Sequence, residues 1–179
     1  MKRRLLQIAA IVAMVAGSCW LSSAADARLE DEVKAAFLYN FAKFVGWPDA
    51  VFAGDDDALV FCLRGNDSFA ESVDRIVSGR TAHGREIVVR RDVALDGLDA
   101  CHLLFLGEEE AGVAQIMQFT ADTSVLTVGD VPSFVDEGGI IGLVVDRGKV
   151  RFEINAAGAE RAGLRISSQL LKLARSVKK

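Results

Sequence analysis

The strongest hydrophobic pattern in the chain lies between residues 32 and 48. It predicts a helix, because one set of positions recurs with the three- and four-residue spacing of a helical face. Pro48 disfavours helical geometry at Trp47, so we expect the helix to end there. Apolar side chains cover much of its circumference, which is typical of a helix that is deeply buried or covered by a partner. The main stripe consists of Val33, Ala36, Phe37, Asn40, Phe41 and Phe44, and a second stripe consists of Leu38, Ala42 and Val45.

After Pro48, short apolar runs alternate with segments of helical spacing. The run at 58–63 is continuously apolar and bounded by turn residues, which is typical of a strand buried on both faces. A helix is expected over 69–77, after residues that can cap it. The acidic residues at 108–110 suit the first turn of a second helix, because negative charge favours a helix N-terminus. Further strands are expected at 87–89, 101–106 and 124–128.

Two apolar runs near the C-terminus, 140–145 and 150–154, flank an Asp-Arg-Gly-Lys sequence and predict an antiparallel hairpin. Gly148 supplies a left-handed turn position between the two strands. Asn155 can cap a short helix, which we expect to end at Gly163.

A last helix is expected over residues 170–177, where Leu170, Leu171 and Leu173 precede basic residues. Strands that alternate with helices predict a mostly parallel sheet covered on both faces, and the hairpin makes that sheet mixed. We therefore expect an α/β fold: a three-layer sandwich with a mostly parallel mixed sheet flanked by helices, and a C-terminal β-hairpin followed by helices. The length of 179 residues and the lack of repeats favour one domain.

The first 27 residues have the features of an export signal. Lys2, Arg3 and Arg4 precede an apolar stretch at 5–16, and Ala27 completes a small-x-small cleavage site. Cleavage after Ala27 leaves a domain of 152 residues, 28–179. Lipidation of Cys19 is one alternative. An uncleaved anchor is another, although the apolar run is shorter than the ~20 residues that span a bilayer.

The charge of the chain argues against nucleic acid and anionic membranes as partners. The formal net charge is −4, and removal of residues 1–27, with three basic residues and one acidic residue, makes it −6. Binding to phosphate backbones or anionic lipid surfaces requires a basic surface, which this composition does not favour.

Cys62 and Cys101 remain as an even pair after the removal of Cys19. In an exported protein such a pair is expected to be oxidised, with two free buried thiols as the alternative. A bridge across the 39 positions between them would stabilise the domain by roughly 4 kcal/mol in the chain-entropy treatment.

The sequence offers little catalytic or metal-binding chemistry. His83 and His102 are the only histidines, and one histidine beside an oxidised cysteine does not supply the three or four ligands of a metal site. There is no glycine-rich phosphate-binding motif. Asp130 stands near other carboxylates, but no nucleophile or second catalytic group accompanies it, so a turn role is favoured. We expect no enzyme activity, no catalytic or metal-binding residues and no cofactor.

Several segments resemble the YfiR family of exported regulatory proteins. The resemblance begins at Val33 to Pro48 and extends through most of the chain. It continues in Val125 to Asp130, Gly138 to Gly142, Val150 to Asn155 and Arg161 to Ala174. The order of these motifs in a chain of this size resembles that of the family. YfiR-like proteins are also known for disulfides, which supports the Cys62–Cys101 pair.

The resemblance implies a periplasmic protein that represses a membrane-bound diguanylate cyclase by binding its periplasmic sensor domain. An outer-membrane lipoprotein can sequester such repressors, and loss of repression favours biofilm formation. The resemblance also places partner recognition at the C-terminal hairpin region. The candidate recognition residues are Gly138, Gly139, Val145, Arg151, Phe152 and Glu153.

The residues also allow other interpretations of structure and function. Arg151 and Glu153 are expected on the face opposite Phe152, where they form either a recognition surface or a solvated charge pair. The apolar helix that begins at Val33 is also suited to a homodimer contact. An alternative function is a periplasmic small-molecule binding module that serves another membrane receptor or sensor kinase. Trp47 and Tyr39 would be candidate wall residues of its pocket, although core packing suits both.

Overall fold

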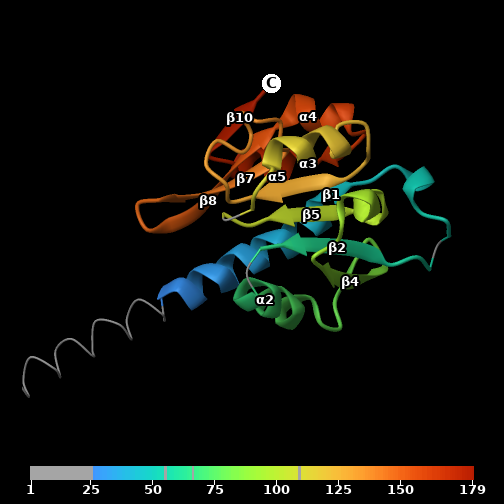
Figure 1. Ribbon diagram of the computed structural model, residues 1–179, viewed down its shortest axis with the longest axis horizontal. Helices are drawn as coiled ribbons and strands as arrows, with labels where there is room; N and C mark the ends of the chain where they lie inside the picture. Colours follow the sequence, from blue (N-terminus) through green and yellow to red (C-terminus); the bar gives the residue numbers. More distant parts are fainter. Residues whose placement is uncertain (1–25, 55, 66, 109) are drawn as a thin grey trace, which may run out of the picture.

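A computed structural model of the protein describes residues 26–54, 56–65, 67–108 and 110–179. Its centre is one eight-stranded sheet with helices on both sides (Figure 1). The strands are β2 (Leu59–Arg64), β3 (Thr81–Ala82), β4 (Arg85–Arg91), β5 (Leu103–Leu106), β6 (Leu126–Gly129), β7 (Ile141–Asp146), β8 (Lys149–Asn155) and β10 (Ser176–Lys178). Across the sheet their order is β10-β8-β7-β6-β5-β2-β4-β3.

The expected mixed, mostly parallel sheet is confirmed. Strands β7, β6, β5, β2 and β4 run parallel to one another. The β7–β8 hairpin and the short β3–β4 pair are antiparallel, and β10 runs parallel to β8. A separate two-stranded sheet pairs β1 (Val45–Gly46) with β9 (Arg165–Ile166).

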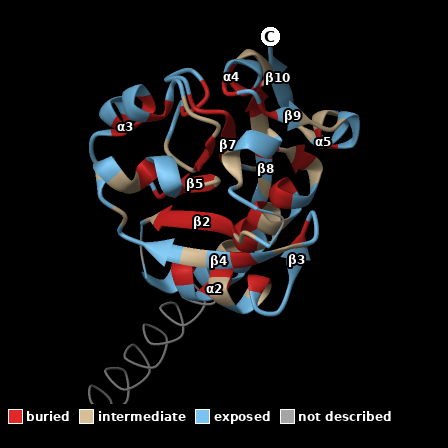
Figure 2. Cartoon of the chain, turned by 90° about the vertical axis from the view of Figure 1, so that its right-hand side faces the viewer, coloured by how far each residue is buried: buried red, intermediate tan, exposed pale blue. Residues whose placement is uncertain are grey.

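Alternating side chains of the central strands divide the core into two layers. On β2, Leu59, Phe61 and Leu63 belong to one apolar cluster, while Val60 and Cys62 belong to the other. The first cluster contains the N-terminal helix, which is helical over the described residues 26–44, and α2 (Asp67–Val77). The second contains α3 (Val113–Thr120) and the 3-10 helix η2 (Leu95–Ala100). Figure 2 shows that β2 between them is buried along its length.

The elements after the hairpin surround its base. Asn155 caps α4 (Ala156–Arg161) by accepting a hydrogen bond from the Gly158 N–H at 2.8 Å, as expected. Helix α5 (Ser168–Leu173) follows β9. The expected last helix is wrong beyond Leu173, because residues 176–178 form strand β10 against β8. The edge of β8 offers backbone groups that need partners, and β10 supplies them.

Two other boundaries differ from expectation. Helix α3 begins at Val113 instead of at the acidic residues 108–110, because Gly112 adopts a left-handed conformation immediately before it. The N-terminal helix also extends further back than residue 32, to residue 26 of the described range. Among the described residues, no helix combines the length and apolar character needed to cross a membrane. The expected export signal and Cys19 lie outside these residues, except for Asp26 and Ala27 in the helix.

Candidate functional site

The β7–β8 hairpin projects from the body of the molecule, as Figure 1 shows. Arg147 and Gly148 both have positive φ at its turn, 50° and 71°, which suits the twist of two antiparallel strands. Val145 is 54% exposed near the tip, and Arg151 is exposed on the facing strand. These two predicted recognition residues are therefore accessible to a partner.

Two of the other predicted recognition residues, Phe152 and Gly139, have structural roles. Phe152 is only 3% exposed and packs against Phe37 and Phe41 of the N-terminal helix, with ring centroids 5.4 and 5.1 Å away. A side chain added at Gly139 would meet the Phe134 ring at 2.2 Å, so glycine is required there for packing. Neither residue is available for direct contact with a partner.

Glu153 and Gly138 are partly accessible. Glu153 lies 3.7 Å from Arg175 in an ion pair between β8 and the segment that leads to β10. Gly138 has a φ of 104° in an exposed turn, and a side chain added there would meet no atom within 4 Å. The predicted recognition residues thus include both exposed and buried positions, which the sequence did not separate.

The hairpin tip and the start of the N-terminal helix together form an apolar groove of about 590 Å³. Leu29 is 62% exposed on the helix, opposite Val145 on the hairpin. We call the apolar lining of this groove the hairpin–helix surface. It consists of Leu29, Val33, Phe37, Val145 and Val150. Sequence analysis placed Val33 and Phe37 on an apolar helix but could not show that they meet the hairpin, more than 100 positions away.

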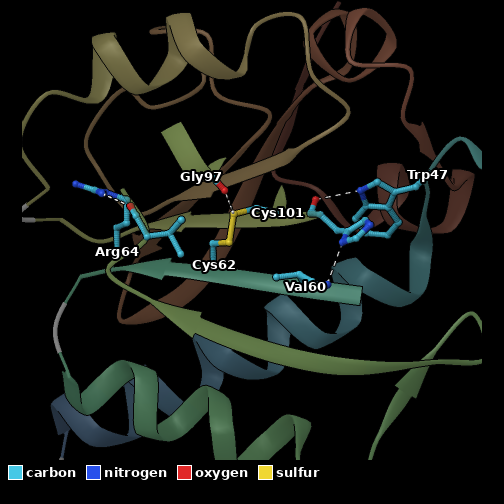
Figure 3. The surroundings of a disulfide bond; sticks show 8 residues. Trp47, Val60, Cys62, Arg64, Gly97 and Cys101 are labelled. Carbon is cyan, nitrogen blue, oxygen red and sulfur yellow. Dashed lines mark hydrogen bonds between the residues drawn. A yellow bond between two sulfur atoms is a disulfide. The ribbon is translucent and has the colours of Figure 1, made fainter. Parts of the chain in front are cut away.

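The Cys62–Cys101 disulfide, expected from the sequence, is present in the structure. It joins β2 to the residue that follows η2, on the α3 side of the sheet (Figure 3). Both cysteines are buried, with exposures of 0 and 3%. The bridge therefore fixes η2 against the central strands.

A second cluster binds the loop after Pro48 to the sheet beside this disulfide. His102 Nδ1 accepts a hydrogen bond from the Val60 N–H at 3.0 Å, and Trp47 Nε1 donates to the His102 carbonyl at 3.0 Å, as Figure 3 shows in part. The Phe52 ring stacks on His102, with centroids 4.6 Å apart, and the Arg85 guanidinium lies over Phe52. Burial lowers the pKa of His102, opposed by a hydrogen bond with the Val51 backbone. The neutral imidazole therefore serves as a structural acceptor.

A polar crevice of about 450 Å³ lies where the carboxyl ends of the central strands meet the N-terminal helix. The chain leaves β2 for β4 on one side and returns to β5 on the other, so the strand order reverses between β2 and β5. Such a switch point is the usual ligand position in open α/β sheets. The backbones after these strands approach closely, with the Gly107 N–H donating to the Arg64 carbonyl at 2.7 Å.

The polar side chains of this crevice are mostly paired with one another. Lys34 Nζ lies 2.8 Å from Asp130 and 2.7 Å from Glu30, and Arg64 lies 2.8 Å from Glu110. Burial lowers the pKa of Lys34, but hydrogen bonds and charge from Asp130 and Glu30 outweigh it and raise that pKa overall. Within the described ranges, no group of three or more His, Cys, Asp or Glu side chains is placed to hold a metal ion. The arrangement is that of an ion-pair network that anchors the N-terminal helix.

Comparison with known proteins identifies the family of this chain. The family model described as YfiR/HmsC-like matches residues 31–175. The chain belongs to the YfiR/HmsC-like family. Proteins of this family are periplasmic and regulatory rather than catalytic.

Two solved structures show a more distant likeness. A conserved domain protein from Vibrio cholerae O1 biovar eltor is 15% identical, with a TM-score of 0.49 over 68% of this chain. The ABC domain in complex with L-Trp from Streptococcus pneumonia is 10% identical, with a TM-score of 0.46 over 66% of this chain. The chain spans about half the length of each of these proteins, 55 and 54%.

Proposed function

We propose that this protein is a periplasmic repressor that binds the sensor domain of an inner-membrane diguanylate cyclase and lowers cyclic di-GMP output and biofilm formation. The observation that supports the proposal most is the hairpin–helix surface in a member of the YfiR/HmsC-like family. Leu29 and Val145 expose apolar area on two elements that the Phe37–Phe152 contact holds together. Exposed apolar area of this kind is typical of protein docking sites.

Repression requires a difference in affinity. The repressor lowers cyclase output only if it binds the inactive conformation of the sensor domain more tightly than the active one. An outer-membrane lipoprotein that covers the hairpin–helix surface would relieve repression by competition for the same residues. A second copy of the chain on this surface, as in a homodimer, would compete in the same way.

The first test is the cellular cyclic di-GMP concentration in a deletion strain and in that strain complemented with the exported protein. Deletion should raise the concentration and complementation should reverse it. No change under several growth conditions would contradict the cyclase proposal and favour the alternative of a periplasmic small-molecule binding module, to be followed by a metabolite screen.

Complementation with variants tests the surface itself. Val145→Asp places a charge in the apolar groove and should abolish repression without loss of the folded domain, because Val145 is exposed. Val88→Asp is a matched control: Val88 is also a strand valine, 38% exposed, on β4 and away from the groove. Equal repression by both variants would place the docking site elsewhere. Size measurements on both variants would detect a homodimer through the same surface.

A further inference from the structure

A cleft of about 370 Å³ separates α3 from α4, away from the hairpin–helix surface. Figure 1 shows the two helices near the same end of the molecule. The apolar floor and walls of the cleft are buried, and they come from α3, from the residues just before β6 and β7, and from the residue after α4. The buried apolar members are Met117, Val125, Ile140 and Ala162.

The two threonine hydroxyls inside the cleft already have hydrogen-bond partners. Thr127 Oγ1 accepts a hydrogen bond from the Ile140 N–H at 3.0 Å. Thr120 Oγ1 donates to the Ile116 carbonyl within α3 at 3.1 Å. The floor therefore favours an apolar group over a polar one, since a polar group buried there would lack partners.

The rim of the cleft carries two opposite charges without partners. Glu137 comes from the turn after β6 and Arg161 from the last residue of α4. Both are exposed, and neither forms a hydrogen bond or ion pair through its side chain with any residue in the described part of the chain. They are not bonded to each other, although they line the same cleft. Gly138, one of the predicted recognition residues, lies beside Glu137 at the rim and adds no side chain that would narrow the opening.

We propose that the cleft between α3 and α4 binds a small zwitterion with an aliphatic body, in the manner of an aliphatic α-amino acid. Arg161 pairs with its carboxylate, Glu137 pairs with its ammonium group, and the aliphatic body covers Met117 and Ile140. The volume is within the range of small-molecule sites. The polar crevice lined by Lys34 is less suitable, because a ligand there would have to break ion pairs that the protein already makes.

The test uses L-norleucine and two analogues that each lack one charge. Hexanoate keeps the carboxylate and pentylamine keeps the ammonium group. Calorimetric titration of the exported protein should show saturable binding of L-norleucine, and binding of each analogue about tenfold weaker, since each loses one charged contact.

Variants of Arg161 and Glu137 test which charged group of the ligand each side chain binds. Arg161→Gln should weaken L-norleucine about tenfold and leave pentylamine unchanged, while Glu137→Gln should weaken L-norleucine and leave hexanoate unchanged. Glu160→Gln, one residue away on α4, is the matched control and should bind all three compounds like the natural chain. Ala114→Phe fills the cleft from an exposed position of α3 and should abolish binding in a folded protein.

Some results would overturn the proposal. These are the absence of saturable L-norleucine binding, equal binding of all three compounds, or binding that Ala114→Phe does not change. This test measures ligand binding and not cyclic di-GMP, so a negative result would not contradict the proposed repression of a cyclase. In the same way, unchanged cyclic di-GMP in the deletion strain would not contradict ligand binding in the cleft.

Discussion

The ring of Phe37 on the N-terminal helix meets the ring of Phe152 on β8 edge to face, with centroids 5.4 Å apart. Phe41 contacts both rings, at 5.7 Å from Phe37 and 5.1 Å from Phe152. These three rings join the first described helix to the C-terminal hairpin. They therefore hold in place the two elements whose exposed ends form the hairpin–helix surface.

Replacement of Phe152 should reveal this structural role. Phe152→Ala should lower the free energy of unfolding by about 3–5 kcal/mol, because it removes a buried ring and leaves a cavity. Denaturant unfolding followed by circular dichroism measures the loss. The neighbouring exposed position gives the control: Arg151→Ala should change the free energy by no more than about 0.5 kcal/mol. A small effect of Phe152→Ala would show that the three-ring contact contributes little.

The disulfide should contribute strongly to stability. Joint replacement in Cys62→Ala/Cys101→Ala should cost roughly 4 kcal/mol, from the unfolded-state entropy of a loop that spans 39 positions. Reductant should lower the melting temperature of the natural chain and leave that of the double variant unchanged. An identical melting temperature with and without reductant in the natural chain, with reduction verified by thiol titration, would contradict this prediction.

The Lys34–Asp130 pair should be costly to break on one side only. Lys34→Met leaves the Asp130 carboxylate largely buried without its main cation, and a loss of about 3 kcal/mol is expected. Lys34→Met/Asp130→Leu removes both charges and should recover most of that loss. Urea unfolding of the natural chain and the two variants gives the comparison. Equal losses in both variants would mean that packing of the lysine stem, rather than charge, stabilises this helix.

His102 should make the domain less stable in mild acid. Its folded-state pKa is lowered from 6.5, mainly by burial, while the Val51 hydrogen bond and Asp57 oppose the shift and Arg85 and Arg90 add to it. The unfolded chain therefore binds the proton more readily than the folded one. The resulting stability is complete above pH 6.5 and is lost as the pH falls below that value toward the lowered pKa.

Melting temperatures between pH 7.5 and pH 5 measure this effect. The natural chain should lose stability over the lower part of that range. His102→Asn can keep an acceptor for the Val60 N–H without a titrating group, so its melting temperature should depend less on pH. The same pH dependence in both proteins would assign the effect to other groups.

Local patterns predicted the central elements well. The continuous apolar run at 58–63 became β2, and the Gly148 turn between two apolar runs became the β7–β8 hairpin. The cap at Asn155 also formed as expected. In each case residues close in sequence were sufficient for the prediction, because strand, turn and cap preferences depend on the local chain.

Features that depend on distant residues could not be predicted. Residues 170–177 have helical spacing, yet 176–178 form β10 because β8 presents an edge to them. Lys34 and Asp130 pair across 96 positions, and nothing local to either residue indicates the other. The apolar alternation of β8 places Phe152 in the core, but a resemblance to a family does not distinguish such a supporting residue from a contact residue.

The buried position of Trp47 gives the protein a built-in optical reporter. The chain has two tryptophans, and Trp20 precedes the expected cleavage point after Ala27. The exported protein would then owe its indole emission to Trp47 alone, which is 5% exposed and bonded to the His102 carbonyl. Its emission should shift to longer wavelength when the loop after Pro48 leaves the sheet. Opening of this cluster in acid can therefore be followed without any added label.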